Sequence, residues 1–421
     1  MAHFEFKRLD FILTIVGLLA LVVDIILDIF TAIRFYTDQD YVRLGIFIFF
    51  LVASSLLVQA YSWLWYEYDE FKMVTNVEKV PSKKSLKILH FLQLGTYLRH
   101  MGVMETAICK YLQLKGVEGM GPDLGDAAVC LSHDVAMLRI VEAFSESLPQ
   151  LALMVTTNIQ KKQQQQALPV IKAIASAFFA SMTVMSYHRS LRSFLKDKQK
   201  QTFCSSVVYL SWNFLLISAR VAALALFSSE LPCYICIHFL CSWFVLLICV
   251  WCCQTNFMNS KEGEVLYRGT VALIWYFNWF NVVKGNTLWK TILYHGYILA
   301  DITLLCGLWF WKINSKDLKN FNYLHLLAYV LIFFVYILGL VVKSIYYHCF
   351  HPKVTPADFK SEDETVDTVL EDSSTERVPD EPDEPGFRRI ITQLDSGRAM
   401  RRGSGDKVNN RMKKLAEHFY S

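Results

Sequence analysis

Charged residues are scarce in this chain of 421 residues: Asp, Glu, Lys and Arg together make up 19% of it, whereas about 25% is usual in a soluble domain. Hydrophobic residues make up 54%. This composition excludes a disordered chain, a coiled coil and an all-β secreted protein. It also excludes a soluble two-domain enzyme, because the apolar residues lie in runs that are too long for a soluble core.

Motifs of catalysis are missing as well. The sequence has no Walker loop, no histidine pair spaced for a metal and no nucleophile elbow, so we do not expect an enzyme. Cys233 and Cys236 have the spacing of a zinc-ligand pair, but no second Cys or His pair follows at the spacing of a finger. Most of the 11 cysteines lie in apolar runs, where a free thiol behaves as a small hydrophobe. We therefore expect no disulfide scaffold, no metal or other cofactor, and no nucleic-acid partner.

Long apolar runs are what the chain has in abundance. A membrane-spanning helix needs about 20 mostly apolar residues, and the backbone within lipid must be hydrogen-bonded inside the segment. Ten runs meet or approach this requirement: 9–35, 43–66, 86–112, 134–158, 167–187, 204–228, 231–255, 265–283, 289–312 and 322–349. The sequence therefore predicts an all-α polytopic membrane protein.

Basic loops predict the topology, because Lys and Arg concentrate on the cytoplasmic side. Lys7 and Arg8 place the N-terminus inside, and five lysines between 72 and 87 also belong inside. The basic loop at 189–200 returns to the cytoplasm only if one of the first five runs enters and leaves by the same face. Run three (86–112) or run four (134–158) is the candidate, and Pro149 favours a broken helix in run four.

The same reasoning predicts one re-entrant segment among the last three runs. We therefore expect about eight transmembrane helices and two re-entrant segments, arranged as two pseudo-repeat halves. Residues 1–203 would form the first half, residues 204–352 the second, and residues 353–421 a cytoplasmic tail. Both termini would then be cytoplasmic. Three lysines between 312 and 319 fall on the opposite side in this arrangement.

The tail differs from the rest of the chain in composition. Residues 361–386 hold eleven acidic residues and one Arg, which is typical of disorder. Residues 387–421 hold nine Arg or Lys and three acidic residues. Within the tail, Met412, Leu415, Ala416 and Phe419 fall on one face of a possible amphipathic helix at 410–420.

Charged residues inside the apolar runs are the candidate functional residues. Asp10 and Asp28 are in phase on a helix, and Asp24 lies about 40° away from them. Each such charge costs about 2.5–3.5 kcal/mol at the bilayer centre, so the set must face water, a polar substrate or each other. Two interpretations stay open: a path for something polar, or buried ion pairs that lock the bundle. The candidates are Asp10, Asp24, Asp28, Arg99, Asp134, Glu142, Glu146, Arg189, Arg220 and Asp301.

Several stretches resemble the XK-related family. The most specific is DVAMLRIVEAFSESLPQL at 134–151, and others are YHRSLR at 187–192, SVVYLSWN at 206–213, LYRGT at 266–270 and YYHCFHP at 346–352. The similarity covers roughly residues 8–352. It implies a fold of eight spans and two re-entrant segments, in agreement with the count from the loop charges.

The resemblance also implies a function. The apoptotic members of the family are plasma-membrane phospholipid scramblases that work without ATP and expose phosphatidylserine as an engulfment signal. Their charged column, which would fall on the ten candidates above, is thought to carry the lipid headgroup. A family relative has an Asp where this chain has Ser186, so that step differs here. The family also implies a single-span chaperone subunit of the basigin or neuroplastin type.

Cleavage of the tail by an effector caspase is implied as the switch. Caspases cut after Asp, with an acidic residue three positions earlier and a small residue following. Asp367 fits best, since Glu364 precedes it at that spacing and Thr368 follows. Asp383 is the second candidate and Asp395 the third.

Two other functions remain compatible with the residues. An ion- or solute-coupled secondary transporter would also have repeat halves, broken helices and buried carboxylates. In a non-conducting receptor or scaffold, the charges would be structural.

Overall fold

The computed structural model describes residues 8–350 except 72, 74, 115–122, 162–166, 194–200, 283–286 and 317–322. All regular secondary structure in these ranges is helical, and six of the helices are long and apolar enough to cross a membrane. The prediction of an all-α polytopic membrane protein is therefore confirmed. The predicted tail and its helix at 410–420 lie outside the described residues.

The helices follow the apolar runs closely. They are α1 (Arg8–Thr37), α2 (Tyr41–Tyr68), α3 (Asn76–Lys79), α4 (Lys83–Phe91), α5 (Gly95–Leu114), α6 (Asp123–Glu142), α7 (Leu148–Gln160), α8 (Ala167–Ser193), α9 (Phe203–Glu230), α10 (Pro232–Cys252), α11 (Lys261–Phe277), α12 (Leu288–Lys316) and α13 (Tyr323–Ile345). Two π-helical turns, Ala143–Ser147 and Tyr346–Phe350, follow α6 and α13.

The six helices that are long and apolar enough to cross a membrane are α1, α2, α9, α10, α12 and α13. Two further rods are long but more polar: α8, and the continuous helix made of α6, the first π turn and α7. Counting these two rods as spans would give eight, with the shorter α4–α5 and α11 as the two re-entrant segments. That division remains a prediction.

Run three is broken, whereas run four is not. In run three, α4 ends at Phe91 and α5 begins at Gly95, and Gln93 between them has a φ of 64° in the left-handed region. Run four continues without a break across Pro149, so the expectation that this proline favours a broken helix was wrong. The π turn supplies the reason: the Leu148 N–H bonds the carbonyl of Ala143, five residues back. This wider turn makes room for the proline ring near the start of α7.

Helix α11 ends inside the protein. The chain runs on without helix at 278–282, and Asn278, Phe280 and Val282 in this stretch are buried. Trp275 donates from its indole nitrogen to the carbonyl of Phe280 at 2.7 Å, and Tyr294 of α12 donates to the carbonyl of Trp275 at 2.7 Å. The carbonyls of Trp275 and Phe280 are thus satisfied by protein donors, which the predicted re-entrant segment would require if it lies in lipid.

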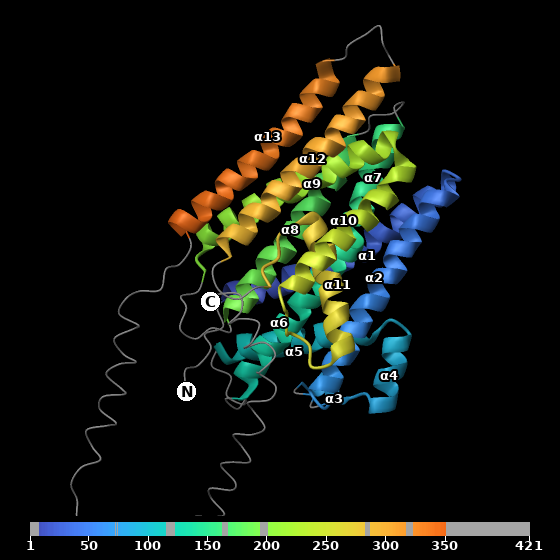
Figure 1. The fold of residues 1–421 in the computed structure, drawn as a ribbon. Coiled ribbons are helices and arrows are strands. Elements are labelled where there is room, and N and C mark those ends of the chain that lie inside the picture. The colour runs from blue at the N-terminus through green and yellow to red at the C-terminus, as the bar shows by residue number, and fades with distance from the viewer. Residues whose placement is uncertain are drawn as a thin grey trace, which may run out of the picture.

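Helix α9 is the centre of the bundle. It is the most buried of the six apolar spans and packs against α7, α8, α12 and α13, whereas α1 is the least buried. Figure 1 shows α12 and α13 on one side of the molecule and α1 and α2 on the other. Large apolar residues on α1, such as Leu19, Ile29 and Phe30, are exposed because they face the surroundings of the bundle.

Candidate functional site

Four of the predicted carboxylates meet where α1 faces the rod formed by α6 and α7. Asp28 and Asp24 of α1 and Glu142 of α6 all lie close enough to Glu146 to interact with it electrostatically. Arg139, one turn before Glu142 on α6, interacts electrostatically with Glu142. We call Asp24, Asp28, Glu142 and Glu146 the carboxyl cluster.

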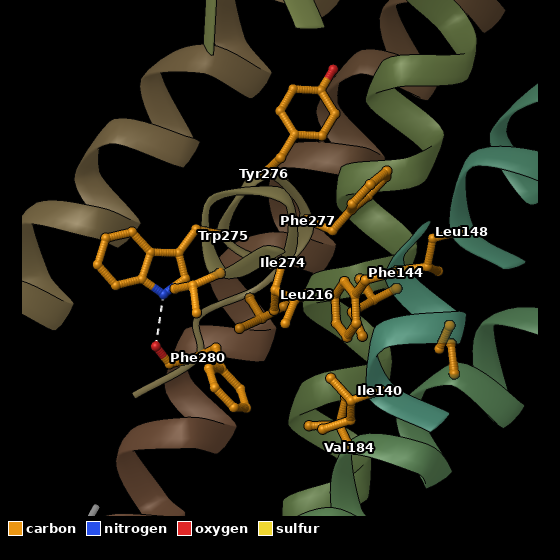
Figure 2. Close-up of a cluster of buried hydrophobic side chains, with 14 of the residues drawn as sticks. Ile140, Phe144, Leu148, Val184, Leu216, Ile274, Trp275, Tyr276, Phe277 and Phe280 are labelled. Carbon is orange, nitrogen blue, oxygen red and sulfur yellow. Dashed lines mark hydrogen bonds between the residues drawn. The ribbon is translucent and has the colours of Figure 1, made fainter. Parts of the chain in front are cut away.

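The rod has two distinct faces around its π turn. Ile140, Phe144 and Leu148 pack into the buried core, where the ring of Phe144 lies 6.3 Å from that of Phe277 at the end of α11 (Figure 2). Glu142 and Glu146 alternate with these residues along the rod and reach toward α1. The local sequence therefore separates an apolar core face from an acidic face, and the acidic face meets the least buried span.

Arg99 and Asp134 form a buried ion pair between α5 and α6. Arg99 Nη1 lies 2.9 Å from Asp134 Oδ2, and the two residues are 2% and 4% exposed. The guanidinium also donates to the hydroxyl and the carbonyl of Ser62, each at 3.1 Å, and its centre lies 3.8 Å from the ring centre of Tyr66. Every side of this arginine is engaged, so it ties α5 to both α2 and α6.

Arg220 and Asp301 form a second buried pair, between α9 and α12. Arg220 Nη1 lies 2.6 Å from Asp301 Oδ2, and Arg220 Nε donates to the carbonyl of Tyr276 at 3.0 Å. The other carboxylate oxygen lies 3.0 Å from His238 Nε2 of α10, whose Nδ1 is 3.1 Å from the Tyr276 hydroxyl. One carboxylate thus connects α9, α10, α11 and α12.

The remaining predicted residues lie elsewhere. Arg189 at the end of α8 donates to the Ser206 hydroxyl at 2.7 Å and to the carbonyl of Gln201 at 3.3 Å. Asp10 belongs to α1, but its side chain lies outside the described residues, as do the tail residues Asp367, Asp383 and Asp395. The predicted set therefore forms separate groups: the carboxyl cluster, two ion pairs, and Arg189 at the junction of α8 with the start of α9.

Sequence reasoning missed three buried polar residues of α12 and α13. Lys343 Nζ lies 2.8 Å from His295 Nε2, and His295 Nδ1 lies 2.9 Å from the Tyr336 hydroxyl. A signal was present, because Lys343 is a basic residue within the last apolar run. The candidate list held only Asp, Glu and Arg and so omitted it.

The loop between α1 and α2 carries an exposed ion pair. Lys161 Nζ lies 2.6 Å from Asp38 Oδ2. The pKa of Asp38 is below its ordinary value, chiefly because of this hydrogen bond, with smaller contributions from the positive charges of Lys161 and Arg34. In the part of the chain that the structure describes, no group of three or more His, Cys, Asp or Glu could hold a metal ion.

Comparison with known proteins matches this chain over most of its length. A family model described as XK-related protein matches residues 12–352. XK-related protein 8 of Tetraodon nigroviridis is 38% identical over 354 residues, which cover 83% of this chain and 85% of that protein. The protein of the same name from Gasterosteus aculeatus is 37% identical over 358 residues, covering 83% and 86% of the two chains. The one from Pan troglodytes is 34% identical over 348 residues, covering 82% and 84%.

Proposed function

Because the chain belongs to the XK-related family, we propose that it is a phospholipid scramblase that equilibrates lipids between the two leaflets without ATP. In this proposal it acts at the plasma membrane with both termini in the cytoplasm. Caspase cleavage of its tail activates it during apoptosis, and phosphatidylserine then appears outside as an engulfment signal.

The carboxyl cluster is the observation that carries this proposal. A phospholipid headgroup cannot cross about 30 Å of hydrocarbon unaided. The cluster places four carboxyl groups beside α1, the least buried span, where a headgroup could reach them while its acyl chains stay in the bilayer. The amine groups of common headgroups are cationic, so carboxylates are suitable partners if each contact is weak enough to be released.

The two buried ion pairs have a different role from the carboxyl cluster in this proposal. Arg99 and Arg220 each already lie against an oppositely charged carboxylate, Asp134 and Asp301 respectively, so these pairs act first as locks between helices. A headgroup could use their charges only by competing with an existing ion pair. We therefore assign the first contact with lipid to the carboxyl cluster and not to these pairs.

In this proposal the C-terminal tail regulates scrambling. Asp367, followed by Asp383, is the proposed caspase site. Cleavage there would release the basic end of the chain, which as a tethered segment acts at high effective concentration. A chaperone subunit of the basigin or neuroplastin type is the proposed partner for delivery to the surface.

The test uses the purified full-length protein in liposomes that contain a trace of fluorescent phosphatidylcholine. A membrane-impermeant reductant bleaches the outer leaflet, and scrambling exposes the inner pool to it. We expect bleaching to pass one half after treatment with an effector caspase, and the Asp367→Ala, Asp383→Ala double variant to stay at one half. If the treated wild type stops at one half, the protein is not a caspase-activated scramblase.

The carboxyl cluster also fits a second function, an ion- or solute-coupled secondary transporter. Glu146 lies close to the carboxyl groups of Asp24, Asp28 and Glu142, and membrane carboxyl groups serve as proton relays in transporters. Such a protein would accumulate a soluble substrate along a proton gradient, whereas a scramblase moves labelled lipid in the absence of any gradient. The same liposomes distinguish the two.

A further inference from the structure

Lys343 lies near the end of α13 in a buried polar group between α9, α12 and α13. Its ammonium group is 2.8 Å from His295 Nε2, and His295 Nδ1 is 2.9 Å from the Tyr336 hydroxyl. The ammonium also lies 4.9 Å from the ring centre of Trp212 on α9. In its ammonium form Lys343 can only donate, and His295 then accepts at Nε2 and carries its proton on Nδ1, facing Tyr336.

The Lys343 amine is buried with no acidic partner in the part of the chain that the structure describes. Lys343 is 6% exposed and His295 is 7% exposed. In the described ranges no carboxylate forms an ion pair with Lys343, in contrast to Arg99 and Arg220, which each have one. A buried charge is normally paired, because removal from water is costly. Lys343 thus presents N–H donors inside the bundle that no carboxylate of the described ranges accepts from.

The position of Lys343 relative to α9 indicates what these donors bind. Arg189 contacts α9 at Ser206, Lys343 contacts it at Trp212, and Arg220 belongs to α9 itself. At 1.5 Å per residue, the three levels are separated by about 9 Å and about 12 Å along the helix. Together they span about 21 Å of a hydrocarbon core of about 30 Å. Lys343 therefore lies at a level of α9 between those of the two arginines.

We propose that Lys343 binds the phosphate group of a phospholipid headgroup as it passes between Arg189 and Arg220. This inference rests on the proposed scrambling function and names the part of the substrate that the α9 side of the bundle recognises. Phosphate oxygens accept charge-assisted hydrogen bonds from the ammonium N–H groups that His295 leaves open, and Trp212 excludes water from them.

The site is closed in this structure. Just beyond Lys343, the Ser205 hydroxyl at the start of α9 donates to the carbonyl of Phe350 at 3.1 Å, and Gln201 donates to the Tyr346 hydroxyl at 3.2 Å. A headgroup therefore reaches Lys343 only when the end of α13 separates from α9.

The experiment compares two lipids in liposomes of the caspase-treated full-length protein. One is fluorescent phosphatidylcholine, and the other is fluorescent glucosylceramide, which has no phosphate. We expect Lys343→Met to slow phosphatidylcholine about tenfold relative to wild type, which is the value of about one charge-assisted hydrogen bond. The variant should leave glucosylceramide unchanged, and Lys343→Arg should restore most of the phosphatidylcholine rate. Lys161→Met, at an exposed lysine, is the matched control and should change neither lipid.

The outcomes separate the inference from the proposed function. Equal slowing of both lipids by Lys343→Met, or no slowing of either, overturns the phosphate site while scrambling by the wild type stands. Failure of the wild type to move either lipid removes the proposed function and the inference with it. The melting temperature of Lys343→Met is measured in detergent. If it is at or above that of the wild type, a slower scrambling rate is not caused by loss of the folded structure.

A last arm distinguishes lipid phosphate from free phosphate. Inorganic phosphate is added on both sides of the membrane at constant ionic strength. Unchanged scrambling supports the lipid assignment. If inorganic phosphate inhibits the wild type but not Lys343→Met, the site binds free phosphate, and the assignment to lipid phosphate is overturned.

Discussion

Replacing Asp301 by Leu would leave the guanidinium group of Arg220 buried without its counter-ion. The two groups are 2.6 Å apart, and their side chains are 0% and 9% exposed for Arg220 and Asp301 respectively. Removing one partner of a buried ion pair costs about 3–5 kcal/mol, mostly because the other charge stays buried and unpaired. We therefore expect Asp301→Leu to be among the most destabilising single substitutions in the bundle.

The other contacts of Arg220 determine how much stability Asp301→Leu loses within the range of about 3–5 kcal/mol. Its Nε still donates to the carbonyl of Tyr276, and the ring centre of Tyr276 is 4.9 Å from its guanidinium carbon. These contacts keep part of the charge solvated by protein dipoles, so we expect about 3 kcal/mol. The Arg220→Met, Asp301→Leu double variant removes both charges and should recover most of that loss, because a buried pair is often replaceable by apolar residues of similar volume.

The assay is reversible unfolding in mixed micelles with increasing denaturing detergent, followed by far-ultraviolet circular dichroism. Asp38→Asn is the control, because it breaks an exposed pair with Lys161 whose expected value is about 0–1 kcal/mol. The reasoning is refuted if Asp301→Leu costs no more than Asp38→Asn. It is also refuted if the double variant loses as much stability as the two single variants added together, since the pair would then have no coupling energy.

Three further predictions test other parts of the molecule. Glu142→Gln combined with Glu146→Gln should lower the scrambling rate in liposomes that contain the same amount of protein as for the wild type, and an unchanged rate would remove the carboxyl cluster from the lipid path. Gly339→Ala should destabilise the contact of α13 with α9 by about 1–3 kcal/mol, because its Cβ would meet a buried leucine methyl group at 2.7 Å. Gly296→Ala has nothing within 4 Å of the new atom, and the same unfolding assay should find it neutral or stabilising by up to about 1 kcal/mol, because Ala favours a helix over Gly. Because the pKa of Asp38 is lowered in the folded protein, its ion pair stabilises above the ordinary value of 3.8 and loses that contribution as pH falls through the folded-state pKa. The stability difference between wild type and Asp38→Asn, under about 1 kcal/mol at neutral pH, should therefore shrink in acid.

The long apolar helices could be predicted from the sequence for a simple reason. A run of about 20 apolar residues in lipid has no other way to satisfy its backbone. The six spans by length and apolarity lie in helices α1, α2, α9, α10, α12 and α13, each within a few residues of its predicted run.

The breaks in the helices were harder to predict. Pro149 is the usual signal for a break, yet a preceding π turn accommodates its ring, so the rod continues. The actual break in run three follows no proline. It lies at Gln93, where the ring of His90 packs so closely against Gly95 that a Cβ there would lie 2.4 Å from it. That close approach depends on His90 being held by Ser62 of α2 and by its own helix, which local sequence does not reveal.

The charged residues within the apolar runs were likewise predictable only in part. The sequence alone determined which residues are ionisable within apolar runs, and the cost of burying charge required that they find polar surroundings. Helical phase places Asp24 and Asp28 on one face of α1, but it says nothing about how a neighbouring helix is rotated or which of its residues faces them. Only the tertiary structure brings Glu146 to Asp28 and gives Arg99 and Arg220 their separate partners. It also leaves Lys343 without an acidic partner among the described residues, because pairing is a property of packed helices and not of any one of them.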